Sequence, residues 1–376
     1  MDISFLSSYP PKKCGVGEFC FDLAQGLLKN QPSLAINVYA IDDIPQGYIY
    51  DPVVKSHFYY LDQSGYKNAA KLINSDQSKI CILQHEFNLF GGQEYSYLYS
   101  FVDNLNKPLI VVVHNIPIDK KYKNFDERKK HLLYLNKYVK HFVTMSKVGK
   151  NALINLGISE KKVTVINHGL PDDLITNRLA EEKIESSFSF QDKFVVAQFG
   201  LLHKNKNIES LLEGISLVRK AIPNILCLII GVEQNGGDLY INKLKNESRS
   251  LGIEKIVKFV TSYPSREDLY RWLNAANVLI TPYLRKDQIS SGVLTFYMGV
   301  GKPIITTRYL YAQELLEKIG IFVPFADSKA ISVALLRLAS DKEYYLQKKN
   351  LVCKKGESLI WSKQAKKYLD LIQKIS

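Results

Sequence analysis

Three loops of the sequence combine glycine, lysine and serine in patterns that suit the binding of an anion. The first loop, C-G-V-G-E-F, carries Gly15 and Gly17 between the apolar run at residues 3–8 and a segment with apolar residues at helical spacing. Glycine lets a backbone approach a ligand closely, and the start of the following helix offers free N–H groups. This loop could hold a phosphate or a polar sugar; a tight turn without a ligand is the alternative.

The other two loops add a positive charge and hydroxyl groups. Lys206 follows the apolar run 194–202, and a lysine at such a position can meet a phosphate as a compact charge. Ser290, Ser291 and Gly292 open a helix later in the chain, where hydroxyl groups and unsatisfied N–H groups make an anion site. A serine cap alone would explain only one of these three residues. The loops together predict a site for an anionic ligand.

Polar residues and glycines also end several apolar runs, where a buried strand would not need them. They are His85-Glu86, His114-Asn115, His168-Gly169, Gly200 and Gly231. In open parallel sheets, ligands bind beyond the carboxyl ends of the strands. A single histidine is more often structural, so it is the repetition at one edge that favours a site.

The strands and helices that position these loops follow the alternating order of a parallel α/β sheet. Continuous apolar, β-branched runs alternate with helical segments along the whole chain, which is typical of parallel sheets covered on both faces. The predicted strands are 3–9, 35–41, 57–61, 80–87, 109–115, 141–146, 163–168, 194–202, 225–231, 256–263, 277–283, 303–309 and 321–325. We interpret the chain as an α/β protein of two Rossmann-like domains that face each other across a cleft, with the polar segment 172–193 as the linker.

Composition narrows the class of protein. The length of 376 residues suits two domains. The 50 Lys and Arg residues exceed the 37 Asp and Glu residues, and a net charge of +13 attracts anionic partners. Nucleic acid is disfavoured, because the basic residues are dispersed and no zinc-finger or RNP-type motif is present. Five scattered cysteines without a C-x-x-C pair predict neither disulfides nor a zinc site. The sequence has no run of 18 apolar residues and no secretory signal, which predicts a cytoplasmic protein.

Taken together, these features resemble the retaining glycosyltransferases of family 4, which have the GT-B fold of two Rossmann-like domains. The likeness covers nearly the whole length and depends on the order and spacing of several segments. They are CGVGEF (14–19), VVVHN (111–115), SKVGKNAL (146–153), KVTVINHG (162–169), FGLLHKNKN (199–207), SSGVLTFYMGVGKPIITTRYLYAQELL (290–316) and SLIWSKQAKKYLDLI (358–372).

The resemblance implies a division of labour between the domains. Residues 1–175 would form the N-terminal domain on the acceptor side, completed by a C-terminal helix at 358–376 that crosses back to it. Residues 190–357 would form the domain that binds the nucleotide sugar. The implied reaction moves a sugar from a UDP- or GDP-linked donor to a hydroxyl of a glycan or glycolipid, with retention of configuration and without an enzymic nucleophile.

The resemblance also assigns roles to individual residues. His114 would touch the donor sugar and Lys206 would bind the diphosphate, and both are the catalytic candidates. The other donor-binding candidates are Gly15, Gly17, Gly200, Gln288, Ser290, Ser291, Gly292 and Val293, and the acceptor-binding candidates are His85, Glu86 and Gly17. A structural turn with a buried histidine is the alternative for residues 84–92.

No metal or other cofactor is expected. Cleavage of a sugar–diphosphate bond needs the departing negative charge stabilised, which preorganised cations and dipoles can do. Enzymes that use Mg²⁺ or Mn²⁺ instead commonly hold it with a D-x-D carboxylate pair. The chain has Asp42-Asp43 and Asp172-Asp173, but no D-x-D at a strand end. Lys206 and the helix after Ser290 are therefore the expected source of positive charge.

Three positions depart from the family pattern. Leu201 stands where the family has a basic residue, and Gln288 and Phe296 stand where it has two glutamates. Because the second glutamate normally holds the nucleotide ribose, a catalytically silent sugar- or nucleotide-binding module is an alternative function. An epimerase or a phosphorylase of the same shape is another. An NAD-dependent dehydrogenase is disfavoured, because Cys20 stands at the third glycine of G-x-G-x-x-G.

A basic and aromatic region of the first half could rest on anionic lipid. Residues 122–142 are predicted to form a helix with Leu132, Leu135 and Val139 on one side. The lysines of the region are Lys120, Lys121, Lys123, Lys129, Lys130, Lys137 and Lys140. A solvated helix face is the alternative. With lipid contact, the protein would lie at the inner face of the membrane.

Overall fold

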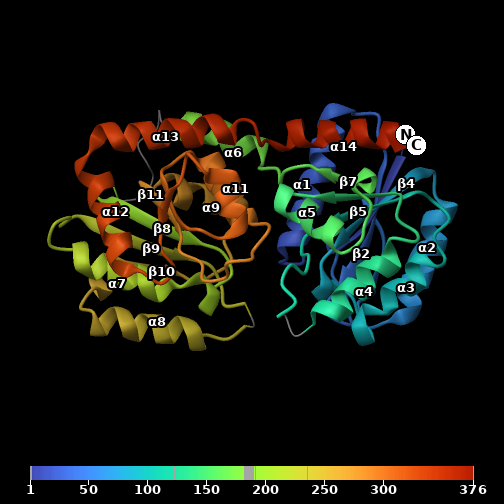
Figure 1. Ribbon diagram of the computed structural model, residues 1–376, viewed down its shortest axis with the longest axis horizontal. Coiled ribbons are helices and arrows are strands. Elements are labelled where there is room, and N and C mark those ends of the chain that lie inside the picture. The colour runs from blue at the N-terminus through green and yellow to red at the C-terminus, as the bar shows by residue number, and fades with distance from the viewer. Residues whose placement is uncertain (1, 122–123, 182–189, 191, 235, 376) are drawn as a thin grey trace. The chain divides into compact units, whose positions relative to one another are not determined.

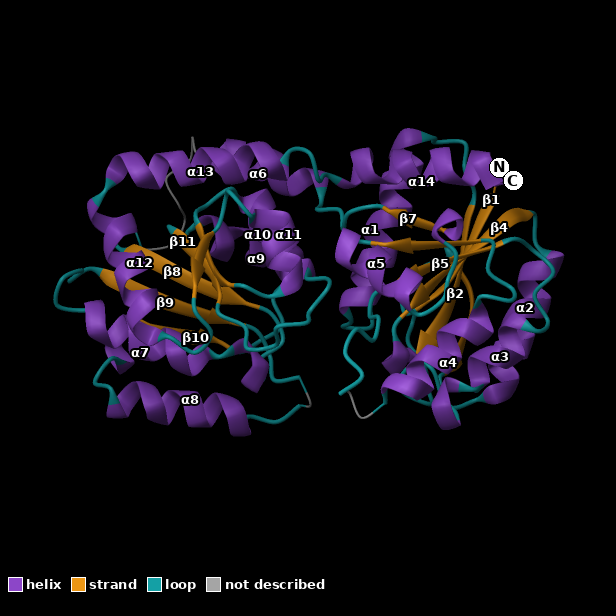
Figure 2. Ribbon diagram, in the orientation of Figure 1, coloured by secondary structure: helices purple, strands orange, loops and turns teal. Residues whose placement is uncertain are grey.

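The computed structural model describes residues 2–121, 124–181, 190, 192–234 and 236–375. These residues form two compact units, one comprising Met1–Gly169 with Trp361–Ser376 and the other comprising Leu170–Ile360. In each unit a sheet lies between helices (Figure 1 and Figure 2). The predicted positions 122–123 in the basic region, and 182–189 and 191 in the linker, lie outside the described residues.

The first unit contains one parallel sheet in the order β3-β2-β1-β4-β5-β6-β7. The strands are β1 (Asp2–Ser7), β2 (Ile36–Asp42), β3 (Val54–Tyr59), β4 (Ser78–His85), β5 (Leu109–Val113), β6 (His141–Thr144) and β7 (Val163–Val165). Each matches a predicted strand. The strand order reverses between β1 and β4, so the loops after these strands diverge and leave the crevice where ligands of such sheets bind.

The connections of the first unit are mostly helical. Its helices are α1 (Gly15–Asn30), α2 (Gln63–Ser75), α3 (Tyr97–Val102), α4 (Phe125–Leu135), α5 (Lys147–Asn155) and α14 (Trp361–Ile375), with the 3-10 turns η1 (Phe87–Leu89), η2 (Gln93–Tyr95) and η3 (Glu160–Lys162). The strands need cover on both faces because β1, β4 and β5 are almost wholly buried.

The second unit repeats the plan with six parallel strands in the order β10-β9-β8-β11-β12-β13. The strands are β8 (Phe194–Phe199), β9 (Ile225–Ile230), β10 (Val257–Val260), β11 (Val278–Thr281), β12 (Ile304–Thr307) and β13 (Ile321–Val323). Here the order reverses between β8 and β11. The two-domain α/β fold predicted from the sequence is confirmed.

Eight helices are described in the second unit. They are α6 (Asp172–Glu181), α7 (Ile208–Val218), α8 (Leu239–Ser250), α9 (Arg266–Asn274), α10 (Gly292–Val300), α11 (Leu310–Leu316), α12 (Ser328–Ser340) and α13 (Lys342–Gly356), with the 3-10 turns η4 (Lys204–Lys206) and η5 (Glu254–Ile256). Fully buried aliphatic residues such as Leu211, Ile229 and Leu335 join α7, β9 and α12 in one core.

Helix α14 packs on α1 in the first unit, as the resemblance implied (Figure 1). Trp361 is 2% exposed, and its ring meets Phe19 of α1 edge to face at 4.8 Å. Asn30, at the end of α1, donates from Nδ2 to the Ser362 carbonyl at 2.8 Å. Helix α14 is therefore one of the helices that cover the first sheet.

The predicted linker was wrong in its first part, because residues 172–181 form the helix α6. Leu174 of α6 is fully buried, and Arg178 is only 5% exposed. The Arg178 guanidinium donates to the Gly299 carbonyl and to Glu357, each at 3.3 Å. A helix held partly by a buried arginine is polar in composition, so its sequence had the appearance of a linker.

The predicted helix at 122–142 was too long, because α4 ends at Leu135. The side chain of Lys162 donates to the carbonyl groups of Asn136 and Val139, both at 3.0 Å. These bonds satisfy carbonyls that would otherwise lack partners at the helix end, and the chain then enters β6. Val139 is buried, but it follows the turn at 136–138 and does not belong to the helix.

Candidate functional site

Lys206 lies at the strand-order reversal of the second sheet. It ends the turn η4 after β8, and Tyr283 lies just beyond β11, the neighbouring strand. The Lys206 Nζ donates to the Tyr283 hydroxyl at 2.8 Å and lies 4.0 Å from the centre of the Tyr283 ring. Lys206 is only 8% exposed, so its side chain is largely shielded from water.

Burial changes the charge of this amine. It lowers the pKa of Lys206 to about 7, because the ammonium form is disfavoured away from water. The neighbouring His203 is neutral near pH 7, because burial, with a smaller effect of Lys206, lowers the pKa of His203 to about 4. An anion at Lys206 would restore the positive form and would bind strongly in a site of low polarity.

Gly200 lies beside the amine, at a place that leaves no room for a side chain. This residue follows β8 with φ of +126°, and a Cβ there would lie 3.0 Å from Val293 Cγ2 and 3.7 Å from Lys206 Nζ. Gly231, after β9, has φ of +142° and abuts the Gly200 carbonyl oxygen, which would be 1.9 Å from an added Cβ. Glycine suits both positions, because the backbone has a positive φ there and a Cβ would come too close to neighbouring atoms.

We expect Gly231→Ala to lower the free energy of unfolding more than Gly237→Ala does. Both glycines have positive φ, +142° and +78°, so each alanine incurs a strain of roughly 1–3 kcal/mol. Only at Gly231 would the new Cβ also collide with backbone, because nothing lies within 4 Å at Gly237. Urea denaturation measures the difference, and equal losses would show that contact with Gly200 does not exclude a side chain.

The first turn of α10 lies beside Gly200. Ser291 caps this helix, and its hydroxyl accepts from the Leu294 N–H at 3.2 Å. The N–H groups of Gly292 and Val293 also belong to the first turn, where a helix offers them no internal partner. A Cβ built at Gly200 would lie nearest to a side-chain atom of Val293, so the first turn of α10 and Lys206 both lie beside this glycine.

The loop before α10 is tied to the protein by Gln288. The side-chain Nε2 of Gln288 donates to the Ser290 carbonyl at 2.9 Å, and the backbone carbonyl of Gln288 accepts from the Tyr311 N–H at 2.9 Å. These bonds shape the loop that delivers Ser290 and Ser291. The predicted donor-binding residues of the second unit therefore lie together, and direct contact of Gln288 with a ligand stays a prediction.

The structure shows the surroundings of two residues that depart from the family pattern, Leu201 and Phe296. Leu201 follows Gly200 and is 41% exposed, so this position presents an apolar side chain to solvent where the family has a cation. Phe296 of α10 is partly buried, with its ring 6.5 Å from that of Phe199. The neighbouring Tyr297 hydroxyl accepts from the Phe199 N–H at 2.8 Å, which ties α10 to the end of β8 without a carboxylate.

In the first unit, the opening loop enters α1 at Gly15. The backbone of Gly17 lies against Tyr9, where an added Cβ would be 3.3 Å from Tyr9 N and Cα. Gly15 faces open space, with nothing within 4 Å of an added Cβ. The peptide bond between Pro10 and Pro11, in the same loop, is cis. Close packing accounts for Gly17, whereas Gly15 leaves room at the start of the helix.

Phe19 of α1 joins two of the predicted histidines. Its ring meets those of His114 and His168 edge to face, at 4.7 Å and 4.9 Å. The His114 Nε2 is 2.8 Å from Oε1 of the buried Gln84, so the neutral ring carries its proton on Nε2. Burial, with a smaller effect of His168, lowers the pKa of His114 to about 3. His114 is therefore neutral and fixed in orientation by Phe19 and Gln84.

The acceptor candidates separate into buried and accessible residues. His85 is fully buried: its Nε2 lies 3.0 Å from Nε2 of His131, and burial holds its pKa well below the usual range. This environment fits the structural alternative for residues 84–92. Glu86 is partly exposed, and its Oε1 accepts from Asn115 at 3.4 Å, which brings together the ends of β4 and β5.

Three residues that position the site were missed in the sequence. Tyr283 looked like the apolar end of a strand, and Phe19 like an ordinary core residue of the first helix. Gln84 is a buried amide within a strand, and that single polar residue was a signal. A buried amide in an apolar strand usually serves a specific partner, here His114.

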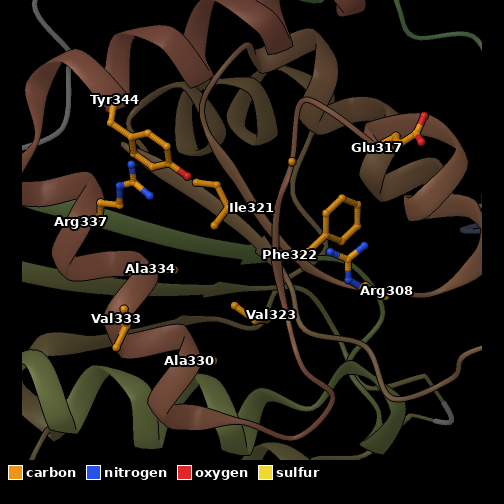
Figure 3. A pocket seen from close by; sticks show the side chains of 11 residues that line it. Arg308, Glu317, Ile321, Phe322, Val323, Ala330, Val333, Ala334, Arg337 and Tyr344 are labelled. Atoms are coloured by element: carbon orange, nitrogen blue, oxygen red, sulfur yellow. The ribbon is translucent and has the colours of Figure 1, made fainter.

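A cavity of the second unit lies away from these residues. It measures about 570 Å³ and lies between β13 and α12, and it includes none of the predicted site residues (Figure 3). Arg308 and Arg337 line it, stacked on the rings of Phe322 and Tyr344 at 4.6 Å and 3.7 Å. A second cavity, of about 480 Å³, borders the loop that carries Lys204.

Comparison with known proteins bears on the fold and on the class of protein. Residues 193–341 match the family Glycosyl transferases group 1. An uncharacterized glycosyltransferase of Methanocaldococcus jannaschii is 22% identical over 310 residues, 78% of this chain and 75% of that protein. HepE of Anabaena in complex with UDP and glucose is similar with a TM-score of 0.76 at 15% identity over 100% of both chains. Sucrose-phosphate synthase of Thermosynechococcus elongatus is similar with a TM-score of 0.75 at 15% identity over 100% of this chain and 99% of the other. These likenesses support the predicted GT-B fold and the glycosyltransferase class, while membership of family 4 and retention of configuration stay predictions.

Proposed function

We propose that this chain, a glycosyltransferase of the GT-B type, is a retaining enzyme that moves a hexose from a UDP- or GDP-linked donor to a hydroxyl of a glycan or glycolipid. The observation that carries the proposal is that Lys206, Gly200 and the first turn of α10 lie beside one another at one strand-order reversal. UDP is the first nucleotide to test, because the similar HepE structure contains UDP.

The proposed reaction needs little from the protein beyond positive charge and orientation. As the bond between the sugar and the diphosphate breaks, negative charge develops on the departing oxygen. The Lys206 ammonium and the N–H groups of Gly292 and Val293 would stabilise that charge. The acceptor hydroxyl would attack from the same face of the sugar and pass its proton to the departing phosphate, so configuration is retained and neither an enzymic base nor a nucleophile is required.

We propose that the donor site works without a metal ion. Lys206 and the start of α10 supply the positive charge that Mg²⁺ or Mn²⁺ would otherwise provide. Turnover should therefore be unchanged after dialysis against a chelator. A loss of turnover that returns on addition of Mg²⁺ or Mn²⁺ would contradict this part of the proposal.

The decisive experiment is a donor screen followed by product analysis. UDP- and GDP-linked sugars would be incubated with the protein and a panel of glycan and glycolipid acceptors, and NMR would give the configuration of any product. An inverted product would refute retention. Nucleotide binding without turnover would favour the silent binding module. Conversion without an acceptor would indicate an epimerase, and conversion only with inorganic phosphate would indicate a phosphorylase.

We expect His114→Ala to lower kcat while leaving the KM for the nucleotide sugar within about twofold. The proposed contact of His114 with the donor sugar is a neutral hydrogen bond, and the loss of one worth about 2 kcal/mol corresponds to roughly 30-fold. Steady-state kinetics would measure this change. His57→Ala is the control, because His57 lies in the edge strand β3, where it pairs with Asp42. Equal effects of the two variants would remove His114 from the site.

Contact with anionic lipid stays a proposal for the surface around α4. The Tyr134 ring lies 3.9 Å from that of Tyr99, and Lys137 lies 4.9 Å from it. Among the described residues, every helix is too short or too polar to cross a bilayer. Sedimentation with vesicles rich in anionic lipid should retain the wild type and release Lys137→Glu; equal retention would contradict the proposal.

A further inference from the structure

Tyr283 is the one described side chain that hydrogen-bonds the Lys206 amine. The contact is double, since the amine also lies over the ring of the same tyrosine at 4.0 Å. Both side chains are buried, with Tyr283 at 0% and Lys206 at 8% exposure. Lysine has a flexible four-carbon stem, so an unsupported amine would sample many positions. Tyr283 restricts it to one.

The tyrosine is itself held firmly. Its ring stacks on that of Tyr309, with centres 5.3 Å apart and planes at 19°. Its backbone carbonyl accepts from the Thr307 hydroxyl at 2.6 Å, and the preceding carbonyl, of Pro282, accepts from Asn207 at 3.1 Å. These bonds connect the chain after β11 to β12 and to the start of α7. The support for Lys206 is therefore part of the sheet framework.

Gly200 lies close to the amine. An ammonium group has three donors, and Tyr283 takes one of them. A Cβ at Gly200 would lie only 3.7 Å from Nζ, so a side chain there would fill the space through which an anion would reach the other two donors. The same space is bordered by Val293 in the first turn of α10.

We propose that Tyr283 is a positioning residue that directs Lys206 at the diphosphate of the nucleotide sugar. Its hydroxyl accepts one hydrogen bond from the ammonium group and its ring faces the charge, so that the two remaining donors meet the anion. This inference rests on the function proposed above. Tyr283 acts through Lys206 and need not touch the substrate.

The groups around the amine allow a clean pH test. Burial raises the pKa of Tyr283 well above its usual range, and His203 has a pKa of about 4, so neither titrates near neutral pH. Lys204, on the same turn, is exposed. A change in the binding of UDP near neutral pH therefore reports Lys206. Loss of the Tyr283 hydroxyl removes a partner of the charged amine and should move that change to lower pH.

The experiment compares Tyr283→Phe, which keeps the ring, with Tyr309→Phe, which removes a hydroxyl from the other member of the stacked pair. Tyr283→Phe should weaken UDP binding about tenfold at a pH above neutrality, less below it, and should lower kcat more than it changes KM. Tyr309→Phe should stay within about twofold of wild type. Wild-type behaviour of Tyr283→Phe would overturn the proposal.

A double-mutant cycle separates positioning from a structural role. In the Lys206→Met background, Tyr283→Phe should have no further effect on UDP binding, because the residue through which it acts is gone. An equal effect in both backgrounds would overturn the proposal. If no UDP or GDP ligand binds the wild type, the proposed function fails, and NMR of labelled lysine then decides. A lower Lys206 pKa in free Tyr283→Phe supports the positioning role, and an unchanged pKa refutes it.

Discussion

Replacing Lys206 by methionine should lower kcat/KM for the nucleotide sugar by about 10³-fold, as expected for the loss of a preorganised group that stabilises a departing charge. Methionine is unbranched and fills a similar apolar volume. The fold should persist, because Lys206 closes a short turn and its stem is buried, while its amine makes one hydrogen bond. Steady-state kinetics with UDP-glucose as the first donor, together with circular dichroism, would measure both outcomes.

A matched control lies two residues away. Lys204 belongs to the same turn and is also a lysine, but its side chain is exposed. Lys204→Met should change kcat/KM by no more than about threefold, because exposed charges are screened by water and salt. If the two variants lose activity equally, general attraction of an anion by the basic loop would explain the effect, and a specific role of Lys206 would be refuted.

The strands could be predicted because both sheets are parallel and buried, which makes their strands continuous apolar runs. The ends of the strands were less predictable. The run 194–202 stays apolar past the last residue of β8, Phe199, but the positive φ of Gly200 turns the chain out of the sheet. A sequence shows the apolar character of Leu201 and Leu202 and not the turn that removes them from the strand.

Contacts between distant segments account for most of what the sequence did not predict. His85 and His131 are 46 residues apart, and only the fold shows that they pair in a buried cluster. Tyr283 and Lys206 are 77 residues apart, and a tyrosine at the end of an apolar strand gives no sign of such a partner. In contrast, glycines and serines at helix starts were visible, because those requirements are local to the chain.

Binding of a nucleoside diphosphate should weaken with rising pH above neutrality. The charged form of Lys206 binds the anion, and the pKa of this amine in the empty site is about 7. A bound diphosphate stabilises the ammonium form and so raises that pKa. Between the two pKa values the amine must take up a proton on binding, so affinity falls by about tenfold for each unit of pH. Below the lower value, Lys206 is already charged and contributes no pH dependence.

The titration of the ligand does not imitate this effect. A terminal phosphate has a second pKa of about 6, so UDP is fully ionised throughout the range above neutrality. Calorimetry in buffers of different ionisation enthalpy would count the protons taken up, with about half a proton expected at the pKa of Lys206 and nearly one well above it.

Two variants then test the assignment. Lys206→Arg keeps a permanent charge, because arginine is not deprotonated in proteins, and its UDP affinity should be level across the same range. Lys206→Met should bind weakly at every pH, also without a slope. A slope that survives in Lys206→Arg would belong to another group, and the buried amine beside Tyr283 would then no longer be the group whose charge controls nucleotide binding.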